Sequence, residues 1–261
     1  YVLINGNQIV MIFLNYLMTR NTELGTLTGN EYIVKTIVTT ETIRTIAEAQ
    51  HIKMYDCFTG FKWIANVMRE NEGKARYLGG GEESYGFMAE DFVRDKDSVS
   101  AISLMAEIAA WAKDKGLNMT DMLIDIYMKY GFSREKGISL VRKGKSGAEE
   151  IIALMKQFRE NPPKEIAGSP VVTVKDFQSL VETNVATGET KKLDMPATSN
   201  VLQYYTADRT KVSVRPSGTE PKIKFYIEVH DTLASADEYK ATEARADEKI
   251  DRIAKEFGIT K

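Results

Sequence analysis

The chain has 261 residues, of which 43% are apolar, and its 35 basic and 37 acidic side chains give a net charge of −2. This length can fill one large or two medium-sized hydrophobic cores. The balanced charge gives no general attraction for nucleic acid or acidic membranes, so we expect neither as a partner and expect any phosphate site to be local. The single cysteine, Cys57, excludes an internal disulfide framework and fits a cytoplasmic location. The apolar stretch 9–14 is too short to span a bilayer.

The first half of the chain alternates between helical and strand-like periodicity. The pattern predicts helices over 8–18, 41–50, 58–69, 99–115 and 120–130, and strands over 32–39, 52–55 and 75–78. Asp97 and Ser98 are candidate N-caps for the long apolar helix. Strands separated by helix-length segments predict an α/β domain with a largely parallel sheet covered by helices.

The second half has a different pattern, which predicts a second domain. Residues 131–147 hold four glycines and a basic run, a composition typical of an exposed connection between domains. A helix over 148–159 is followed by short strands over 171–174, 201–205, 211–214 and 222–229, a hairpin around 186–188 and an amphipathic helix over 235–257. We therefore expect an α/β domain over 1–140 and a smaller α+β domain with an antiparallel sheet over 141–261.

The loop Arg215-Pro216-Ser217-Gly218-Thr219 lies between two of the predicted strands. A guanidinium binds phosphate with two hydrogen bonds, hydroxyls donate, and glycine lets the backbone approach a ligand closely. Lys224, on the following strand, adds a second positive charge. The loop therefore suits a phosphate group, although a polar hairpin with a solvated Arg215 explains the same residues.

The segment GGGEESYG, residues 79–86, follows a predicted strand at the end where open α/β sheets bind ligands. Its adjacent carboxylates, Glu82 and Glu83, accept hydrogen bonds and repel phosphate, so the segment suits sugar hydroxyls. An acidic surface turn is the alternative interpretation. The glycine spacing does not match a dinucleotide-binding fingerprint.

Two further segments carry cationic side chains near predicted helix starts. Thr59, Gly60 and Lys62 open one helix, where the positive end of the helix dipole favours anions. An N-cap followed by a core-facing Trp63 is the alternative there. Lys96 lies in Arg-Asp-Lys-Asp before the long apolar helix, and by charge alternation alone this segment is a solvated helix entry.

Taken in chain order, seven segments resemble the C-terminal half of the phosphohexomutases, specifically the phosphoglucomutase/phosphomannomutase group. They are TGFKW, GEESYG, RDKD, KGKSGAEEI, FRENPPKEIAG, SNVLQYY and RPSGTEPKIKFY. The resemblance covers nearly the whole chain. In this family four domains surround one cleft, and the resemblance implies that this chain holds the third, a three-layer α/β domain that reads the sugar, and the fourth, which grips the substrate's phosphate.

The resemblance also implies roles for individual residues. Glu82 and Ser84 would bond sugar hydroxyls, and Thr59, Gly60 and Lys62 would line the same cleft. The phosphate that is not being transferred would be held by Arg215, Ser217, Gly218 and Thr219, with Lys224 as a further basic ligand. Lys96 matches a family position for substrate contact and proton transfer, which makes it the candidate acid or base.

The implied reaction interconverts hexose 1-phosphate and hexose 6-phosphate. A phosphoserine gives its phosphoryl group to one hydroxyl, the bisphosphate intermediate turns around, and the other phosphate returns to the serine. Such a transfer needs in-line positioning and charge stabilisation, usually with magnesium.

Two family motifs are missing from the sequence: the Thr-Ala-Ser-His-type loop with the phosphoserine and the Asp-Gly-Asp-Gly-Asp-type loop for magnesium. Both belong to the N-terminal domains 1 and 2. We therefore expect this chain to hold no metal and to be inactive without those domains. His51 and His230 have no Cys or His companions at ligand spacing, so neither is expected to bind a metal. The alternative is a self-standing phosphosugar-binding or regulatory protein without catalysis.

Overall fold

The computed structural model describes residues 3–142, 144–218 and 220–259. The chain divides into two compact units, Tyr1–Phe132 with Leu233–Ala236, and Ser133–Thr232 with Asp237–Lys261. Each unit has its own sheet. The domain limits 1–140 and 141–261 stay a prediction. No helix among the described residues is long and apolar enough to cross a bilayer.

Helices and strands alternate in the first unit. They are α1 (Gly6–Glu23), β1 (Glu31–Thr36), α2 (Thr42–Ala49), β2 (Lys53–Cys57), α3 (Phe61–Asn71), β3 (Arg76–Gly81), β4 (Phe87–Ala89), α4 (Ser98–Asp114) and α5 (Met119–Tyr130). The sheet has the order β2-β1-β3-β4, with β1 parallel to β2 and β3, and β4 antiparallel to β3. This mixed, mostly parallel sheet confirms the predicted α/β class.

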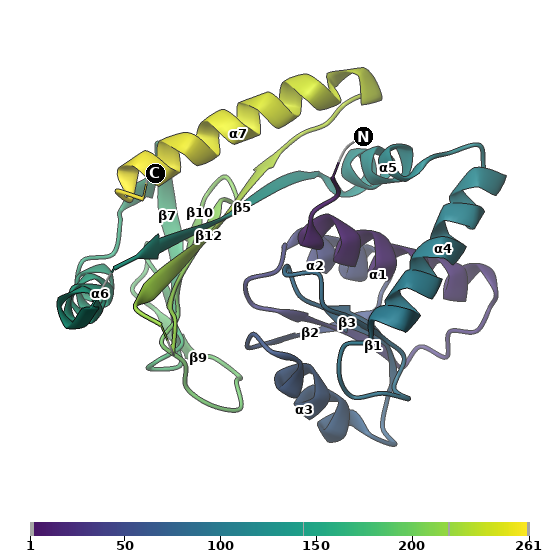
Figure 1. Cartoon of the computed structure of the whole chain (residues 1–261), viewed down its shortest axis with the longest axis horizontal. Helices are drawn as coiled ribbons and strands as arrows, with labels where there is room; N and C mark the ends of the chain where they lie inside the picture. The colour runs from purple at the N-terminus through teal and green to yellow at the C-terminus, as the bar shows by residue number, and fades with distance from the viewer. Residues whose placement is uncertain (1–2, 143, 219, 260–261) are drawn as a thin grey trace. The chain divides into compact units, whose positions relative to one another are not determined.

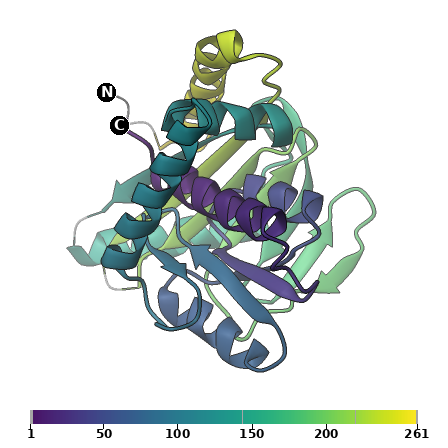
Figure 2. The same ribbon diagram turned by 90° about the vertical axis from the view of Figure 1, so that its right-hand side faces the viewer.

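The first unit has three layers. Helices α1 and α2 cover one face of the sheet and α3 covers the other (Figure 1), and the turned view shows the strands between purple α1 and blue α3 (Figure 2). Because both faces are covered, every residue of β1 is buried. Beneath α3 the core is rich in aromatic side chains: the Tyr32 ring lies 5.5 Å from each of the Tyr55 and Tyr77 rings.

Side-chain caps explain where three of these helices begin. Asn5 and Gln8 form a reciprocal capping box at the start of α1, with both hydrogen bonds at 2.9 Å. Asn118 and Asp121 form another at the start of α5. Asp97 accepts hydrogen bonds from the backbone of Val99 and Ser100, which confirms the predicted cap of α4.

The second unit consists of a sheet with two long helices. Its elements are β5 (Phe132–Val141), α6 (Gly144–Glu160), β6 (Glu165–Ile166), β7 (Ser169–Asp176), β8 (Val181–Asn184), β9 (Thr190–Lys192), β10 (Leu202–Thr206), β11 (Lys211–Pro216), β12 (Lys222–Asp231), η1 (Ala236–Glu238) and α7 (Tyr239–Glu256). The sheet order is β5-β12-β11-β10-β7-β8-β9, and β6 pairs with β7. The pairs from β12 through β9 are antiparallel, which confirms the predicted α+β class.

One face of this sheet is packed with apolar side chains. Along β12, Ile223, Phe225 and Ile227 are buried while the alternate residues point to the other face. Phe158 of α6 contacts Phe225 with a ring separation of 6.0 Å, and Phe257, directly after α7, lies at the same distance from Phe225. Both helices therefore cover the same apolar face.

The expectation of an exposed connection over 131–147 is wrong. Most of this segment is the ten-residue strand β5, hydrogen-bonded beside β12, and α6 begins at Gly144. Its charged residues pair with α7: Arg134 lies 2.9 Å from Asp247, and Lys136 lies 2.8 Å from Asp251. Gly131 and Gly144 have φ values of 99° and 73°, which favour glycine. Gly131 caps the end of α5 and Gly144 begins α6, so both glycines lie at helix ends.

Cys57, at the end of β2, is only 1% exposed. Burial, together with the charge of Asp56, raises the pKa of its thiol above the usual value. Because the thiolate is the reactive form, we expect iodoacetamide to leave the folded chain unmodified at mildly alkaline pH and to alkylate it fully in denaturant. Mass spectrometry measures the two rates, and rapid alkylation of the folded chain would contradict the burial of this thiol.

Candidate functional site

A first candidate site lies where the parallel strands of the first unit end. β1, β2 and β3 run in the same direction, so the loops that follow Thr36, Cys57 and Gly81 meet at one edge of the sheet. After β1 the chain enters α2 on one face, and after β2 it enters α3 on the opposite face (Figure 1). Open α/β sheets bind ligands at such a point, where successive connections diverge.

Glu82 joins two of these loops. The backbone N–H of Gly60 donates a hydrogen bond of 2.5 Å to Glu82 Oε1. Gly60 has a φ of 108°, a conformation that favours glycine, and it forms the cap of α3. The backbone N–H of Glu82 donates to the Gly86 carbonyl at 2.9 Å, which closes the hairpin between β3 and β4. In the described part of the chain, Glu82 Oε2 has no donor, so it can accept from a ligand hydroxyl.

Lys96 lies close to this contact although it is distant in sequence. Its ammonium is 5.3 Å from the centroid of the Phe61 ring, and Phe61 follows Gly60 directly. The same ammonium is 3.3 Å from Asp95 and remains largely exposed. The structure thus brings Gly60, Glu82 and Lys96 together at one edge.

The other residues predicted for sugar contact lie on the same loops. Thr59 is half-buried immediately before Gly60, and Ser84 is exposed in the β3–β4 hairpin. Lys62 is exposed on the first turn of α3, with its ammonium 5.1 Å from the Trp63 ring. Both side chains are exposed, and among the described residues neither Lys62 nor Ser84 forms a hydrogen bond with Glu82.

The start of α1 also contributes to this edge, which sequence analysis missed. Asn7 Oδ1 accepts a hydrogen bond of 3.0 Å from the backbone of Thr40, in the loop after β1. A Cβ atom at Gly6 would lie 1.9 Å from the carbonyl oxygen of Glu83, so α1 packs directly against the 82–86 hairpin. The Asn-Gly-Asn start of an apolar run signals a helix N-terminus, but nothing in the sequence places it beside this hairpin.

A buried ion network lies just below the loops. Lys35 of β1 is fully buried, and its ammonium is 2.9 Å from both Glu41 Oε1 and Asp56 Oδ1. Arg44 also pairs with both carboxylates, at 3.1 Å from Glu41 Oε2. The two cations balance the two anions, as a buried charge requires. The network links the loop after β1 to the end of β2, and sequence analysis did not find it.

Replacing Lys35 with methionine tests the importance of this network. We expect Lys35→Met to destabilise the chain by about 3–5 kcal/mol, because it leaves two partly buried carboxylates without their ammonium partner. Urea unfolding followed by circular dichroism measures the change. Lys53→Met, at an exposed position on β2, is the matched control and should stay within about 0.5 kcal/mol. A Lys35→Met chain as stable as the parent would show that the network does not hold this edge.

A second candidate site is the loop between β11 and β12 in the second unit. Arg215 and Lys224 are direct cross-strand partners in the antiparallel register, so their side chains leave the same face of the sheet. Side chains in such a pair are close, and like charges in this position destabilise a sheet. In the described part of the chain Arg215 forms no ion pair. The register therefore holds two positive charges together.

Hydrogen bonds shape the tip of this loop. The backbone N–H of Ser217 donates to the Lys222 carbonyl at 2.8 Å, and the N–H of Glu220 donates to Ser217 Oγ at 3.3 Å. The hydrogen bond from Lys222, with the charges of Lys222 and Lys224, lowers the pKa of Glu220. Glu220 is thus ion-paired with Lys222. Gly218 is exposed at the tip, and Thr219 lies outside the described residues.

The described residues hold no group of three or more His, Cys, Asp or Glu side chains that could bind a metal ion. His230 instead lies 3.1 Å from Glu228 Oε1, and Glu228 is also paired with Lys211 at 2.8 Å. These three residues lie on β11 and β12 in the sheet of the second unit.

Two family models match the chain. Residues 5–130 match "Phosphoglucomutase/phosphomannomutase, alpha/beta/alpha domain III", and residues 154–246 match "Phosphoglucomutase/phosphomannomutase, C-terminal domain". The phosphoglucomutase of Staphylococcus epidermidis is 34% identical over 223 residues, which cover 85% of this chain and 40% of that protein. The phosphoglucomutase of Staphylococcus haemolyticus is 32% identical over 225 residues, with 86% and 40% covered. The chain thus spans about 40% of the length of these curated relatives.

Solved structures share the fold. The phosphoglucomutase parafusin of Paramecium, in its open form, matches with a TM-score of 0.57 at 14% identity, over 97% of this chain and 43% of that chain. A structure described as a putative phosphomannomutase from Thermus thermophilus matches with a TM-score of 0.56 at 14% identity, over 92% of this chain and 40% of that chain. An α/β unit followed by an α+β unit is thus the arrangement found in phosphohexomutase structures. This chain belongs to the phosphoglucomutase/phosphomannomutase family, and it carries the third and the C-terminal domains.

Proposed function

We propose that this chain is the substrate-binding part of a phosphoglucomutase/phosphomannomutase, which interconverts hexose 1-phosphate and hexose 6-phosphate through a phosphoserine and a bisphosphate intermediate. The observation that supports this most directly is the like-charged pair Arg215 and Lys224, held opposite each other beside the exposed loop tip. A phosphate dianion between the two cations would remove their repulsion and form charge-assisted hydrogen bonds.

The loop after β11 would bind the phosphate that is not being transferred. The Arg215 guanidinium would donate two parallel hydrogen bonds, and Lys224 would act as a point charge. Ser217 and Thr219 would add hydroxyl donors, and Gly218 would allow its backbone N–H to approach the phosphate. Pro216 and Pro221 support this role, because they stiffen the loop and less entropy is then lost on binding.

The loops at the ends of the parallel strands of the first unit would bind the sugar hydroxyls. Glu82 Oε2 and the exposed Ser84 hydroxyl are acceptors and donors of the kind that sugar hydroxyls require. Thr59, Gly60 and Lys62 would complete this surface. The bond between Gly60 and Glu82 supports the assignment, because it fixes the carboxylate while leaving one oxygen available.

Lys96 is the proposed acid or base. As the phosphoryl group leaves the serine and bonds to a sugar hydroxyl, that hydroxyl must lose its proton and the serine oxygen gains one. In the return transfer the serine hydroxyl loses its proton, and the sugar oxygen that gives up the other phosphoryl group gains one. The position of Lys96 near Gly60 and Glu82 supports this role, since the sugar hydroxyls would lie there.

The serine would come from the N-terminal domains, which would also hold magnesium to stabilise charge on the transferred phosphoryl group. We therefore propose that this chain is inactive without those domains. We also propose that the enzyme is cytoplasmic, a location that the single cysteine fits. Because the binding loops occur here without the serine and magnesium motifs, a self-standing phosphosugar-binding or regulatory protein is the second candidate. The gene sequence that precedes codon 1 separates the two: an in-frame serine loop supports the mutase, and a start codon supports the binding protein.

Calorimetric titration with glucose 1-phosphate tests the phosphate site. We expect Arg215→Ala to weaken binding by about tenfold or more, since hydrogen bonds to charged groups are the strong ones. Arg252→Ala, at an exposed position on α7, is the matched control and should bind like the parent. Equal affinities of the parent and Arg215→Ala would contradict the proposed phosphate site.

A further inference from the structure

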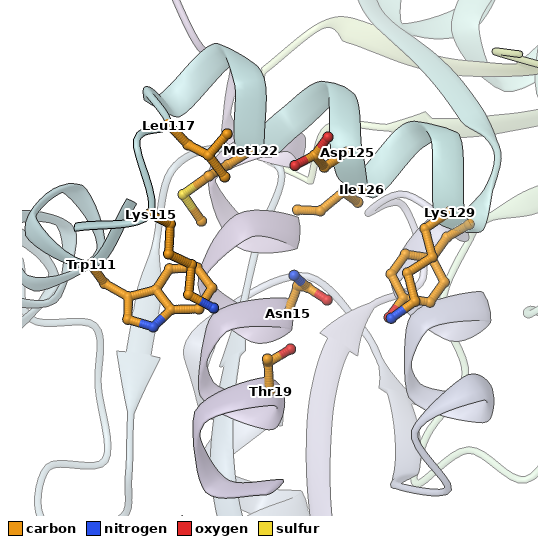
Figure 3. A pocket seen from close by; sticks show the side chains of 10 residues that line it. Asn15, Thr19, Trp111, Lys115, Leu117, Met122, Asp125, Ile126 and Lys129 are labelled. Carbon is orange, nitrogen blue, oxygen red and sulfur yellow. The ribbon is translucent and has the colours of Figure 1, made fainter. Parts of the chain in front are cut away.

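A pocket of about 250 Å³ lies in the first unit, between α1, α4 and α5 (Figure 3). It is lined by Asn15 and Thr19 of α1, Trp111 of α4, Lys115 and Leu117 of the turn after α4, and Met122, Asp125, Ile126, Lys129 and Tyr130 of α5. None of these residues belongs to the loops proposed for sugar or phosphate binding. The pocket is therefore a separate candidate site.

The walls of the pocket are mainly apolar and aromatic. Met122 and Ile126 are buried on the inner side of α5. Trp111 is held by the Tyr16 ring at 5.2 Å in an edge-to-face contact, so its indole has a fixed position. An apolar cavity of about 150 Å³ is enough to admit benzene. This larger pocket therefore has room for an aromatic ring with a short polar group.

The polar groups of the pocket favour a negative charge near one end. Lys129 lies 4.9 Å from the Tyr130 ring centroid, and among the described residues its ammonium has no ion pair, not even with Asp125 one turn earlier. At the other end, the ammonium of Lys115 lies 3.9 Å from the Trp111 ring and is paired with Glu23 at 3.4 Å. The positive charge that has no carboxylate partner is thus at the Lys129 end.

A neutral donor lies between the two ends. Figure 3 shows Asn15 and Thr19 on α1, beneath Ile126 and Met122 of α5, with Trp111 on the left and Lys129 on the right. Asn15 Oδ1 accepts a hydrogen bond of 3.4 Å from Gln50, which leaves the NH₂ group of Asn15 as the donor for a ligand. In Figure 3 the Asn15 oxygen lies on the side of Lys129 and the NH₂ group on the side of Trp111, so the Lys129 ammonium is the group that suits a carboxylate.

We propose that this pocket binds a small aromatic carboxylate. Its ring packs against Trp111 and the Met122 thioether, a pairing that aromatic rings favour. Its carboxylate faces the Lys129 ammonium. The proposal does not depend on the sugar and phosphate sites.

Titration with phenylacetate and with phenylacetamide tests the proposal, because the two probes have the same shape and differ in charge. We expect phenylacetate to bind more tightly, and Lys129→Gln to reduce its affinity by about tenfold while leaving phenylacetamide unchanged. Lys113→Gln, at an exposed position on α4 outside the pocket, is the matched control and should bind like the parent. Ligand-observed NMR and calorimetry on the full chain measure the affinities.

Filling the pocket provides the second test. Thr19→Trp should abolish phenylacetate binding, while binding of glucose 1-phosphate and the unfolding temperature stay near those of the parent. Leu117→Trp, at a half-buried position in the turn after α4, serves the same purpose from the opposite wall. Absence of phenylacetate binding at millimolar concentration, or equal affinity in the parent and both filled variants, would overturn the proposal. So would equal affinity of the two probes.

Discussion

The register of β11 against β12 is the constraint on which the second unit depends. It puts Val212, Val214 and Phe225 on the face that α6 and α7 cover, and these side chains supply much of the apolar burial. The alternation of a strand then leaves Arg215 and Lys224 together on the other face. A shift of one residue would expose the core and separate the cations. The hydrophobic core therefore holds two like charges next to each other although they repel each other.

In the first unit, a different interaction holds the proposed binding residues in position. Its loops are positioned by parallel strands that end at one edge, and the buried ammonium of Lys35 connects the ends of β1 and β2 through Glu41 and Asp56. Above this network, the Gly60 N–H holds Glu82 in place. Stability and recognition are thus linked, because the charged groups that fix the loops lie directly below the residues proposed to meet the sugar.

The sequence predicted the regular elements well where the apolar period was strong, as in α1, β1 and α4. It was wrong over 131–147, since glycines and basic residues suggest a connection, whereas β5 is held by ion pairs between Arg134 and the distant Asp247. Such partners are more than a hundred residues away and leave no local signal. The roles of Glu82 and Arg215 were inferred from family motifs. The Lys35 network and the pocket beside Trp111 depend on tertiary packing, so neither had a signature in the sequence.

Binding of a sugar phosphate through its phosphate group is tested most directly by ligand-linked stability. The unfolding free energy of the chain can be measured in glucose 6-phosphate and in glucose with potassium chloride at matched ionic strength. If the Arg215 loop binds phosphate, glucose 6-phosphate stabilises the chain, by about 2.7 kcal/mol at a hundred times its dissociation constant, and glucose does not. Equal stability in the two solutions at saturating concentrations would contradict phosphate recognition by this chain.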